Sequence, residues 1–155
     1  MIHAGEQATM SQNGKILRVM TPDGEKPRIG STARTLGVRC PQDVALDERG
    51  WAVPGKGMSV APTLTELPHH RIPRRLRKLV PSATGCDDDR CFRLAELSYR
   101  PGVVADALSL RPDLLPRPDG RRHGQIEPTQ PMPVSRFSAA LGDTQARWVL
   151  DEEAP

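Results

Sequence analysis

Two stretches of the 155-residue chain carry residue types that could bind or transform a ligand. The first, residues 51–62, places Gly55, Lys56, Gly57 and Ser59 between apolar flanks. Glycines let backbone N–H groups approach an anion, and a lysine adds positive charge. The Walker spacing G-x-x-x-x-G-K-[ST] is missing, however, because Lys56 stands between the two glycines. A phosphate-binding loop of another kind and a plain connection between strands both stay open.

The second stretch, residues 121–128, carries polar functional groups, among them His123, Gln125 and Glu127. We expect a strand around residues 125–127, followed by a turn rich in proline. These side chains could bind a ligand. A solvated turn residue is the alternative interpretation of Glu127, and a turn or capping role is the alternative for His123.

The strongest basic cluster holds five Lys and Arg residues between Arg71 and Lys78. We expect a short helix that opens after Pro73, with apolar side chains on one side and the cations toward water. The cluster is then either a solvated helix face or a phosphate-binding patch. No aromatic side chain within it could stack on bases. The net charge of +3 is too small to indicate nucleic-acid binding by itself.

Histidine and cysteine do not show the spacing of a metal site. The adjacent side chains of His69 and His70 point apart, and Cys86 and Cys91 have no second cysteine pair to complete four ligands. Together with Cys40 the cysteines form an odd set, and no secretory signal precedes them, so we expect reduced thiols and a cytoplasmic protein. We predict no metal.

Composition predicts one modest core in a loop-rich fold. Hydrophobic residues make up 37% of the chain and aromatic residues 3%, and the length suits one domain. The 16 prolines and 13 glycines exclude an all-helical bundle, because each proline ends or kinks a helix. No apolar run approaches the roughly 20 residues that cross a bilayer, so we expect a soluble protein. The first core candidates are Trp51, Phe92, Phe137 and Trp148.

The domain is expected to cover residues 26–150. Residues 16–20 could form an edge strand, but we favour a disordered lead-in over residues 1–25 because chain ends fray unless they are docked. Residues 151–155 form a polar tail.

Within the domain, the apolar pattern predicts a hairpin over residues 44–53. Residues 92–97 and 103–110 fit a strand or a helical turn, because so few residues do not define a period. An amphipathic helix begins after Pro133. Its apolar face carries Phe137, Ala140, Leu141, Thr144 and Trp148.

Several of these segments, taken in order, resemble small bacterial toxins, the type VI secretion effectors with an ADP-ribosyltransferase-like fold. The matching segments are the stretch from Gly50 to Val60, the Ile72-Pro73 region, and His123 to Met132 with the helix that follows. The chain also resembles uncharacterised proteins of high-GC bacteria. The toxin resemblance implies a compact α+β fold, in which small, twisted, largely antiparallel sheets enclose an NAD cleft.

The resemblance also implies catalytic roles. The transferase class uses an early Arg, a middle Ser and a late Gln/Glu-x-Glu turn, and Arg39, Ser59 and Gln125-Ile126-Glu127 occur in that order. Glu127 would stabilise the oxocarbenium character that develops as the nicotinamide–ribose bond breaks. Gln125 would orient an acceptor, and Tyr99 or Trp51 would stack on the nicotinamide.

The same resemblance implies a cofactor-binding set. Arg39 would hold the pyrophosphate or its ribose, and Ser59 would fix the wall of the cleft. Gly57 and His123 complete this set. Arg34 competes with Arg39 for the anionic group.

We therefore expect a toxin-like NAD-dependent ADP-ribosyltransferase or NAD glycohydrolase, with NAD as its substrate. Its partners would be a protein or nucleic-acid acceptor and a cognate immunity protein, and it could be delivered to the cytosol of a target cell. The alternative is a non-catalytic binding module, which uses the cluster between Arg71 and Lys78 for a phosphate-bearing or acidic partner.

Overall fold

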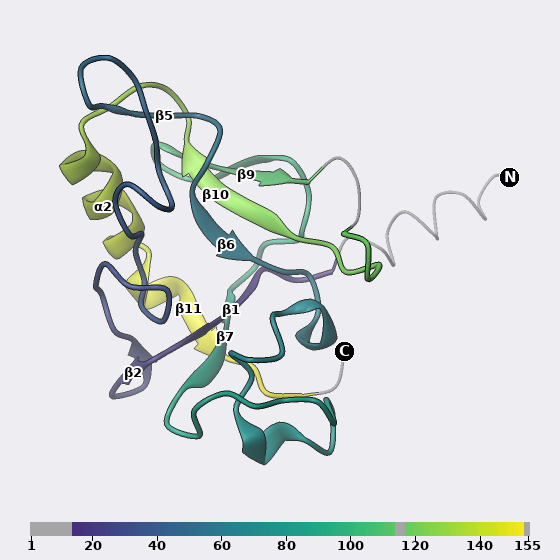
Figure 1. The fold of residues 1–155 in the computed structure, drawn as a ribbon. Helices are drawn as coiled ribbons and strands as arrows, with labels where there is room; N and C mark the ends of the chain where they lie inside the picture. The colour runs from purple at the N-terminus through teal and green to yellow at the C-terminus, as the bar shows by residue number, and fades with distance from the viewer. Residues whose placement is uncertain (1–13, 114–116, 154–155) are drawn as a thin grey trace, which may run out of the picture.

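The chain folds into several small antiparallel sheets with a short helix near the C-terminal end, which confirms the α+β prediction (Figure 1). The computed structural model describes residues 14–113 and 117–153. One main sheet contains β1 (Leu17–Met20), β7 (Arg90–Leu94) and β11 (Trp148–Leu150). The other contains β6 (Met58–Val60), β8 (Gly102–Ala105), β9 (Leu108–Pro112) and β10 (Gly124–Pro128). The two short hairpins are β2 (Pro22–Asp23) with β3 (Lys26–Pro27), and β4 (Ala45–Leu46) with β5 (Ala52–Val53).

The four-stranded sheet runs in the order β6-β10-β9-β8, so β10 has a partner on each side. Gln125 on β10 is in register with Ser59 on β6 and with Arg111 on β9. Because successive side chains of a strand point to opposite faces, these three residues share one polar face. The opposite face is buried in the core and carries Met58, Val60, Leu110 and Ile126. The strand expected around residues 125–127 is confirmed as β10.

β1 lies between two apolar clusters, although it comes first among the strands. It pairs with β7, and all of its residues are buried. Leu17 and Val19 pack in the smaller cluster, whereas Met20 packs in the larger one. Apolar contacts on both faces hold the strand in place, so residues 17–20 belong to the core and not to the lead-in predicted for residues 1–25. Of that lead-in, residues 1–13 lie outside the described part of the chain.

Backbone hydrogen bonds join the two main sheets directly after β6. Ala61 accepts from the N–H of Leu17 at 2.9 Å, and its own N–H donates back at 3.0 Å. The segment that follows contains the 3-10 turns η1 (Leu64–Glu66) and η2 (Arg74–Leu76). The expected helix after Pro73 is therefore a single 3-10 turn. Apolar side chains of this segment, among them Leu64, Leu67, Ile72 and Val80, cover the smaller cluster.

The amphipathic helix α2 (Val134–Gly142) begins where the sequence predicts and ends earlier. Beyond it, the backbone passes through the 3-10 turn η3 (Gln145–Arg147) and enters β11. Trp148 is therefore fully buried in a strand, where its indole N–H donates to Thr144 Oγ1 at 2.9 Å. The predicted helical spacing up to Trp148 was wrong, because a strand that pairs with β7 buries the same side chain by another route.

The remaining short patterns resolve into strands. The hairpin expected over residues 44–53 is confirmed as β4 and β5. Residues 92–97 begin within β7, and residues 103–110 form the β8–β9 hairpin. Three of the four aromatic core candidates are buried, whereas Trp51 is half-buried beneath the guanidinium of Arg49, 3.9 Å from its ring centroid.

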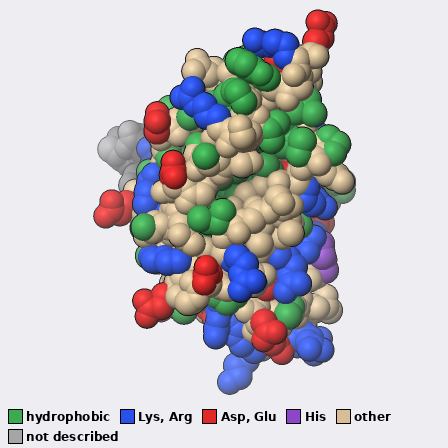
Figure 2. Space-filling model, turned by 90° about the vertical axis from the view of Figure 1, so that its left-hand side faces the viewer, with side chains coloured by type: hydrophobic (Ala, Val, Ile, Leu, Met, Phe, Trp, Pro, Cys, Tyr) green, Lys and Arg blue, Asp and Glu red, His purple; other side chains and the backbone are tan. Residues whose placement is uncertain are grey.

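Charges of opposite sign neighbour each other on the surface. On the face shown in Figure 2, Lys and Arg side chains are interspersed with Asp and Glu. Asp151 pairs with Lys15 at 2.8 Å and Arg93 at 3.1 Å, and Glu152 pairs with Arg75. These pairs tie the first residues of the predicted polar tail to the body of the protein.

The large apolar cluster should depend on the side chain that α2 inserts into it. We expect Phe137→Ala to lower the free energy of unfolding by about 3–5 kcal/mol, because the substitution leaves a cavity where a fully buried ring was. Urea denaturation measures the change. Ser135→Ala, on an exposed position of the same helix, is the control and should change stability by less than about 0.5 kcal/mol. Equal stability of the two variants would contradict the packing described.

Candidate functional site

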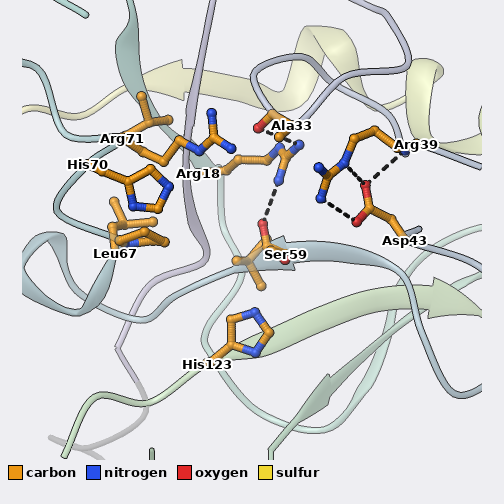
Figure 3. A pocket seen from close by; sticks show the side chains of 12 residues that line it. Arg18, Ala33, Arg39, Asp43, Ser59, Leu67, His70, Arg71 and His123 are labelled. Atoms are coloured by element: carbon orange, nitrogen blue, oxygen red, sulfur yellow. Dashed lines mark hydrogen bonds and ion pairs between the residues drawn. The ribbon is translucent and has the colours of Figure 1, made fainter. Parts of the chain in front are cut away.

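A cavity of about 170 Å³ lies beside the end of β6, between the segment at residues 33–43 and the segment at residues 67–71 (Figure 3). Its lining includes Arg18, Arg39, Arg71, His70 and His123, together with Asp43 and Ser59. The volume is below the roughly 300–1,000 Å³ of pockets that enclose drug-sized ligands. A single anionic group therefore suits the cavity better than a whole dinucleotide does.

Arg18 forms the buried part of this wall. Its guanidinium donates to four backbone carbonyls at 3.0 to 3.4 Å, those of Thr32, Ala33, Thr35 and Ser59. The residue is 7% exposed, and no carboxylate of the described residues forms an ion pair with it. Burial is the main cause that lowers the pKa of Arg18 to about 10, so the group stays charged at neutral pH. The cavity therefore contains a buried cation whose partners are all neutral.

Arg39 and Asp43 form an ion pair on one side of Arg18 (Figure 3). The guanidinium of Arg39 donates to both oxygens of Asp43 at 2.9 Å, and the Arg39 N–H donates to the same carboxylate. Burial by itself would raise the pKa of Asp43, but these hydrogen bonds outweigh it and hold the pKa below its usual value. Arg39 thus lines the cavity, with much of its charge offset by Asp43.

Arg71 and His70 lie on the other side of Arg18 (Figure 3). The side chain of Arg71 makes no hydrogen bond or ion pair with another described residue, so its donors are available to a ligand. Partial burial, followed by the charges of Arg71 and Arg121, lowers the pKa of His70. The imidazole of His70 is therefore mainly neutral at neutral pH.

His123 completes the cavity from the start of β10. Its Nδ1 lies 3.0 Å from Asp113 Oδ2, and the Asp113 N–H donates to the His123 carbonyl at 2.8 Å. A carboxylate at Nδ1 fixes the tautomer and orientation of an imidazole. The other ring nitrogen, Nε2, has no hydrogen bond to another described residue. His123 is thus a positioned imidazole that lines the same cavity as Arg18, Arg39 and Arg71.

The other predicted residues of β10 hold a loop instead of lining the cavity. Gln125 Oε1 accepts from the Gly57 N–H at 2.7 Å, and Glu127 Oε2 accepts from the Gly55 N–H at 2.7 Å. A Cβ atom at Gly57 would lie 1.9 Å from the carbonyl oxygen of Ile126, so only glycine fits there. Because these two amides are already bonded within the protein, the loop at residues 54–57 presents neither of them to an anion.

The structure thus brings together part of the predicted site. Arg39, Ser59 and His123 line one cavity, and Gly57, Gln125 and Glu127 lie outside it. Glu127 on β10 lies four residues beyond His123, which directly precedes the strand, and four residues of extended chain correspond to roughly 13 Å. The side chain of Glu127 is 10% exposed. The catalytic roles of Gln125 and Glu127 stay predictions, and both require the loop at residues 54–57 to move.

Three further candidates do not contribute to the cavity. Arg34 pairs with Asp89 at 2.7 Å and is not among the residues that line the cavity, whereas Arg39 is. Tyr99 is buried and its hydroxyl has no hydrogen bond among the described residues. Trp51 stacks with Arg49 on the surface. Neither aromatic ring is among the residues that line the cavity.

Sequence reasoning missed Arg18, His70 and Asp113 as site residues. A signal for Arg18 was present, because it is the charged residue inside the apolar run of residues 16–20. Arg71 was included only as part of a longer basic cluster. Asp113 carries no comparable signal, since its pairing with His123 depends on the register of β9 and β10.

The sequence predicts neither a metal site nor a membrane-spanning segment. Within residues 14–113 and 117–153, no group of three or more His, Cys, Asp or Glu side chains is placed to hold a metal ion. Over the same residues, no helix combines the length and the apolar character needed to cross a bilayer.

The carboxylate of Glu127 should contribute to stability through the loop that it holds. We expect Glu127→Ala to lower the free energy of unfolding by about 1–3 kcal/mol, because the Gly55 N–H and the guanidinium of Arg111 lose their acceptor. Urea denaturation measures the change, with Ser109→Ala as the control on the same face of the sheet. A loss below about 0.5 kcal/mol would show that the carboxylate is not needed for the loop.

No protein-family model, curated protein or solved structure matches this chain. The resemblance to bacterial effector toxins therefore stays a prediction. The function has to be argued from the charges and hydrogen bonds of the cavity.

Proposed function

We propose that the protein binds a phosphate-bearing ligand in the cavity between Arg18, Arg39 and Arg71. The observation that carries this proposal is the charge of the wall. Three guanidinium groups line the cavity and only one carboxylate, Asp43, is among its described lining residues. Asp43 is already engaged by Arg39, so the remaining charge is positive. Guanidinium groups at a small cavity are the recognition elements that phosphate oxygens favour.

The two unpaired arginines would contribute in different ways. The donors of Arg18 are directed mainly at backbone carbonyls, so its contribution to a ligand is chiefly its charge. Arg71 has no internal partner among the described residues and would donate hydrogen bonds to the phosphate oxygens. A bound anion would also supply the counter-charge that buried Arg18 lacks.

Of the basic cluster that the binding-module alternative invokes, one residue would contact the phosphate. Arg75 donates to the carbonyls of Asp87 and Asp89, and Arg77 donates to the carbonyl of Ala83. These cations serve the protein's own loops. Of the cluster between Arg71 and Lys78, only Arg71 lines the cavity.

A second candidate is the NAD-cleaving transferase or glycohydrolase expected from the sequence. One observation favours it: Ser59, Gln125 and Glu127 share the polar face that leads away from the cavity. A pyrophosphate held by the arginines would leave the rest of NAD to extend along this face toward Glu127. A protein or nucleic-acid acceptor and a cognate immunity protein belong to this candidate.

Phosphate binding should depend on Arg71. We expect inorganic phosphate to raise the melting temperature of the wild-type protein, because a ligand that binds only the folded state stabilises it. Arg71→Ala should raise the Kd for phosphate at least about tenfold, since a charge-assisted hydrogen bond contributes roughly 1.5–3 kcal/mol to binding. Calorimetric titration measures the Kd, which should also rise with salt.

Two controls locate the effect. Arg136→Ala removes the same charge from an exposed position on α2 and should leave phosphate binding unchanged. Arg74→Ala removes a cation of the basic cluster that does not line the cavity. An equal loss in Arg71→Ala and Arg74→Ala would contradict the cavity and support a diffuse patch. An unchanged Kd in Arg71→Ala would contradict the proposal.

The NAD candidate predicts release of nicotinamide that depends on the charge of Glu127. We expect Glu127→Gln to reduce release to background, because it removes the carboxylate that would stabilise an oxocarbenium-like transition state. The Gln side chain keeps an oxygen that can accept from the Gly55 N–H, so the loop should stay in place. Chromatography of NAD incubations measures the product. Background release by both proteins would contradict NAD glycohydrolysis.

A further inference from the structure

His123 is placed for proton transfer at the proposed phosphate site. Its Nδ1 is held by Asp113 at 3.0 Å, and only 13% of its side chain is exposed. The ring lines the cavity together with Arg18 and Arg71. Because Nδ1 is engaged, Nε2 is the atom that can give a proton to a bound group or take one from it.

A second imidazole, that of His70, lines the same cavity from another segment (Figure 3). Partial burial and the charges of Arg71 and Arg121 lower the pKa of His70, so it is mainly a proton acceptor at neutral pH. His123 has a carboxylate partner at Nδ1, whereas the charged neighbours of His70 are the cations Arg71 and Arg121. Two imidazoles at one cavity can serve as the proton donor and the proton acceptor of general acid–base catalysis.

On the basis of the phosphate-binding function above, we propose that the cavity hydrolyses phosphate monoesters, with His70 as general base and His123 as general acid. His70 takes a proton from a water molecule, whose oxygen forms a bond to phosphorus. The bond between phosphorus and the ester oxygen breaks, and the ester oxygen leaves with its electron pair and receives a proton from His123 Nε2. The products are an alcohol and inorganic phosphate, and both imidazoles return to their starting states by proton exchange with water.

The cavity favours a monoester because it encloses one anionic group. A volume of about 170 Å³ accommodates a terminal phosphate and leaves the alcohol portion outside. Arg71 and Arg18 both line the cavity, and their positive charge would stabilise the charge that develops on the phosphate oxygens in the transition state. Asp113 is a positioning residue, which acts on the substrate only through His123.

The test compares two probes that differ in their leaving group, p-nitrophenyl phosphate and glycerol phosphate. The p-nitrophenolate ion leaves without a proton, whereas the glycerol oxygen needs one. We expect wild-type protein to release inorganic phosphate from both. His123→Gln should slow release from glycerol phosphate by about 10²–10⁴-fold and release from p-nitrophenyl phosphate much less. Asp113→Asn should also slow release from glycerol phosphate selectively, by a smaller factor than His123→Gln does.

Each other outcome decides against the proposal. Phosphate binding without release from either probe by wild-type protein would overturn the hydrolysis and leave the binding function standing. Failure of inorganic phosphate to bind would overturn the binding function. An equal loss on both probes in His123→Gln and Asp113→Asn would show a structural role. His69→Gln is the matched control, because His69 is a neighbouring histidine that does not line the cavity.

Discussion

The structure depends on the buried guanidinium of Arg18. This side chain projects from β1, whose backbone is covered on both faces, and it binds carbonyls of the turn at residues 32–35 and of Ser59 on β6. It therefore joins three parts of the chain that are far apart in sequence. Carbonyl dipoles stabilise the cation but do not neutralise it, and an isolated charge removed from water is costly. The cavity beside Arg18 provides room for water or an anion, which lowers that cost.

Polar residues at and beside β10 have two roles, lining the cavity and holding the loop that precedes β6. The sequence pattern does not show which residue has which role. Residues at alternating positions share one face of a strand, so His123, Gln125 and Glu127 look equivalent in the sequence. In the structure His123 lines the cavity, whereas Gln125 and Glu127 accept hydrogen bonds from the loop that precedes β6. The same loop depends on Gly57, where a side chain would collide with the backbone of β10. A strand can thus present a reactive group at one end and hold its neighbour in place at the other.

Local patterns predicted much of the fold, and contacts between distant segments account for what they missed. Alternation along residues 44–46 identified β4, the strand expected around residues 125–127 is β10, and the proline before α2 marked where the helix begins. The helix end was misplaced because Trp148 fits a helical spacing and is equally well buried by pairing with β7. Residues 17–20 were assigned to a disordered lead-in because chain ends tend to fray. In the structure they form β1, which packs against segments far along the sequence. The cavity combines residues 18, 39, 70, 71 and 123, and no spacing rule could bring them together.

The two halves of the cavity differ in how firmly they are fixed. Folding places Arg18 and His123 before any ligand arrives, through the carbonyls around the guanidinium and the Asp113 carboxylate. Groups fixed in this way need no reorganisation when a charge binds or develops. Arg71 has no internal partner among the described residues, and ordering a free arginine side chain costs up to about 2 kcal/mol. In the proposed phosphate site, the rigid wall would set the position of the anion, and the adjustable Arg71 would close on it. This arrangement suits the recognition of one group of constant shape, the phosphate, on ligands whose remaining atoms lie outside the cavity.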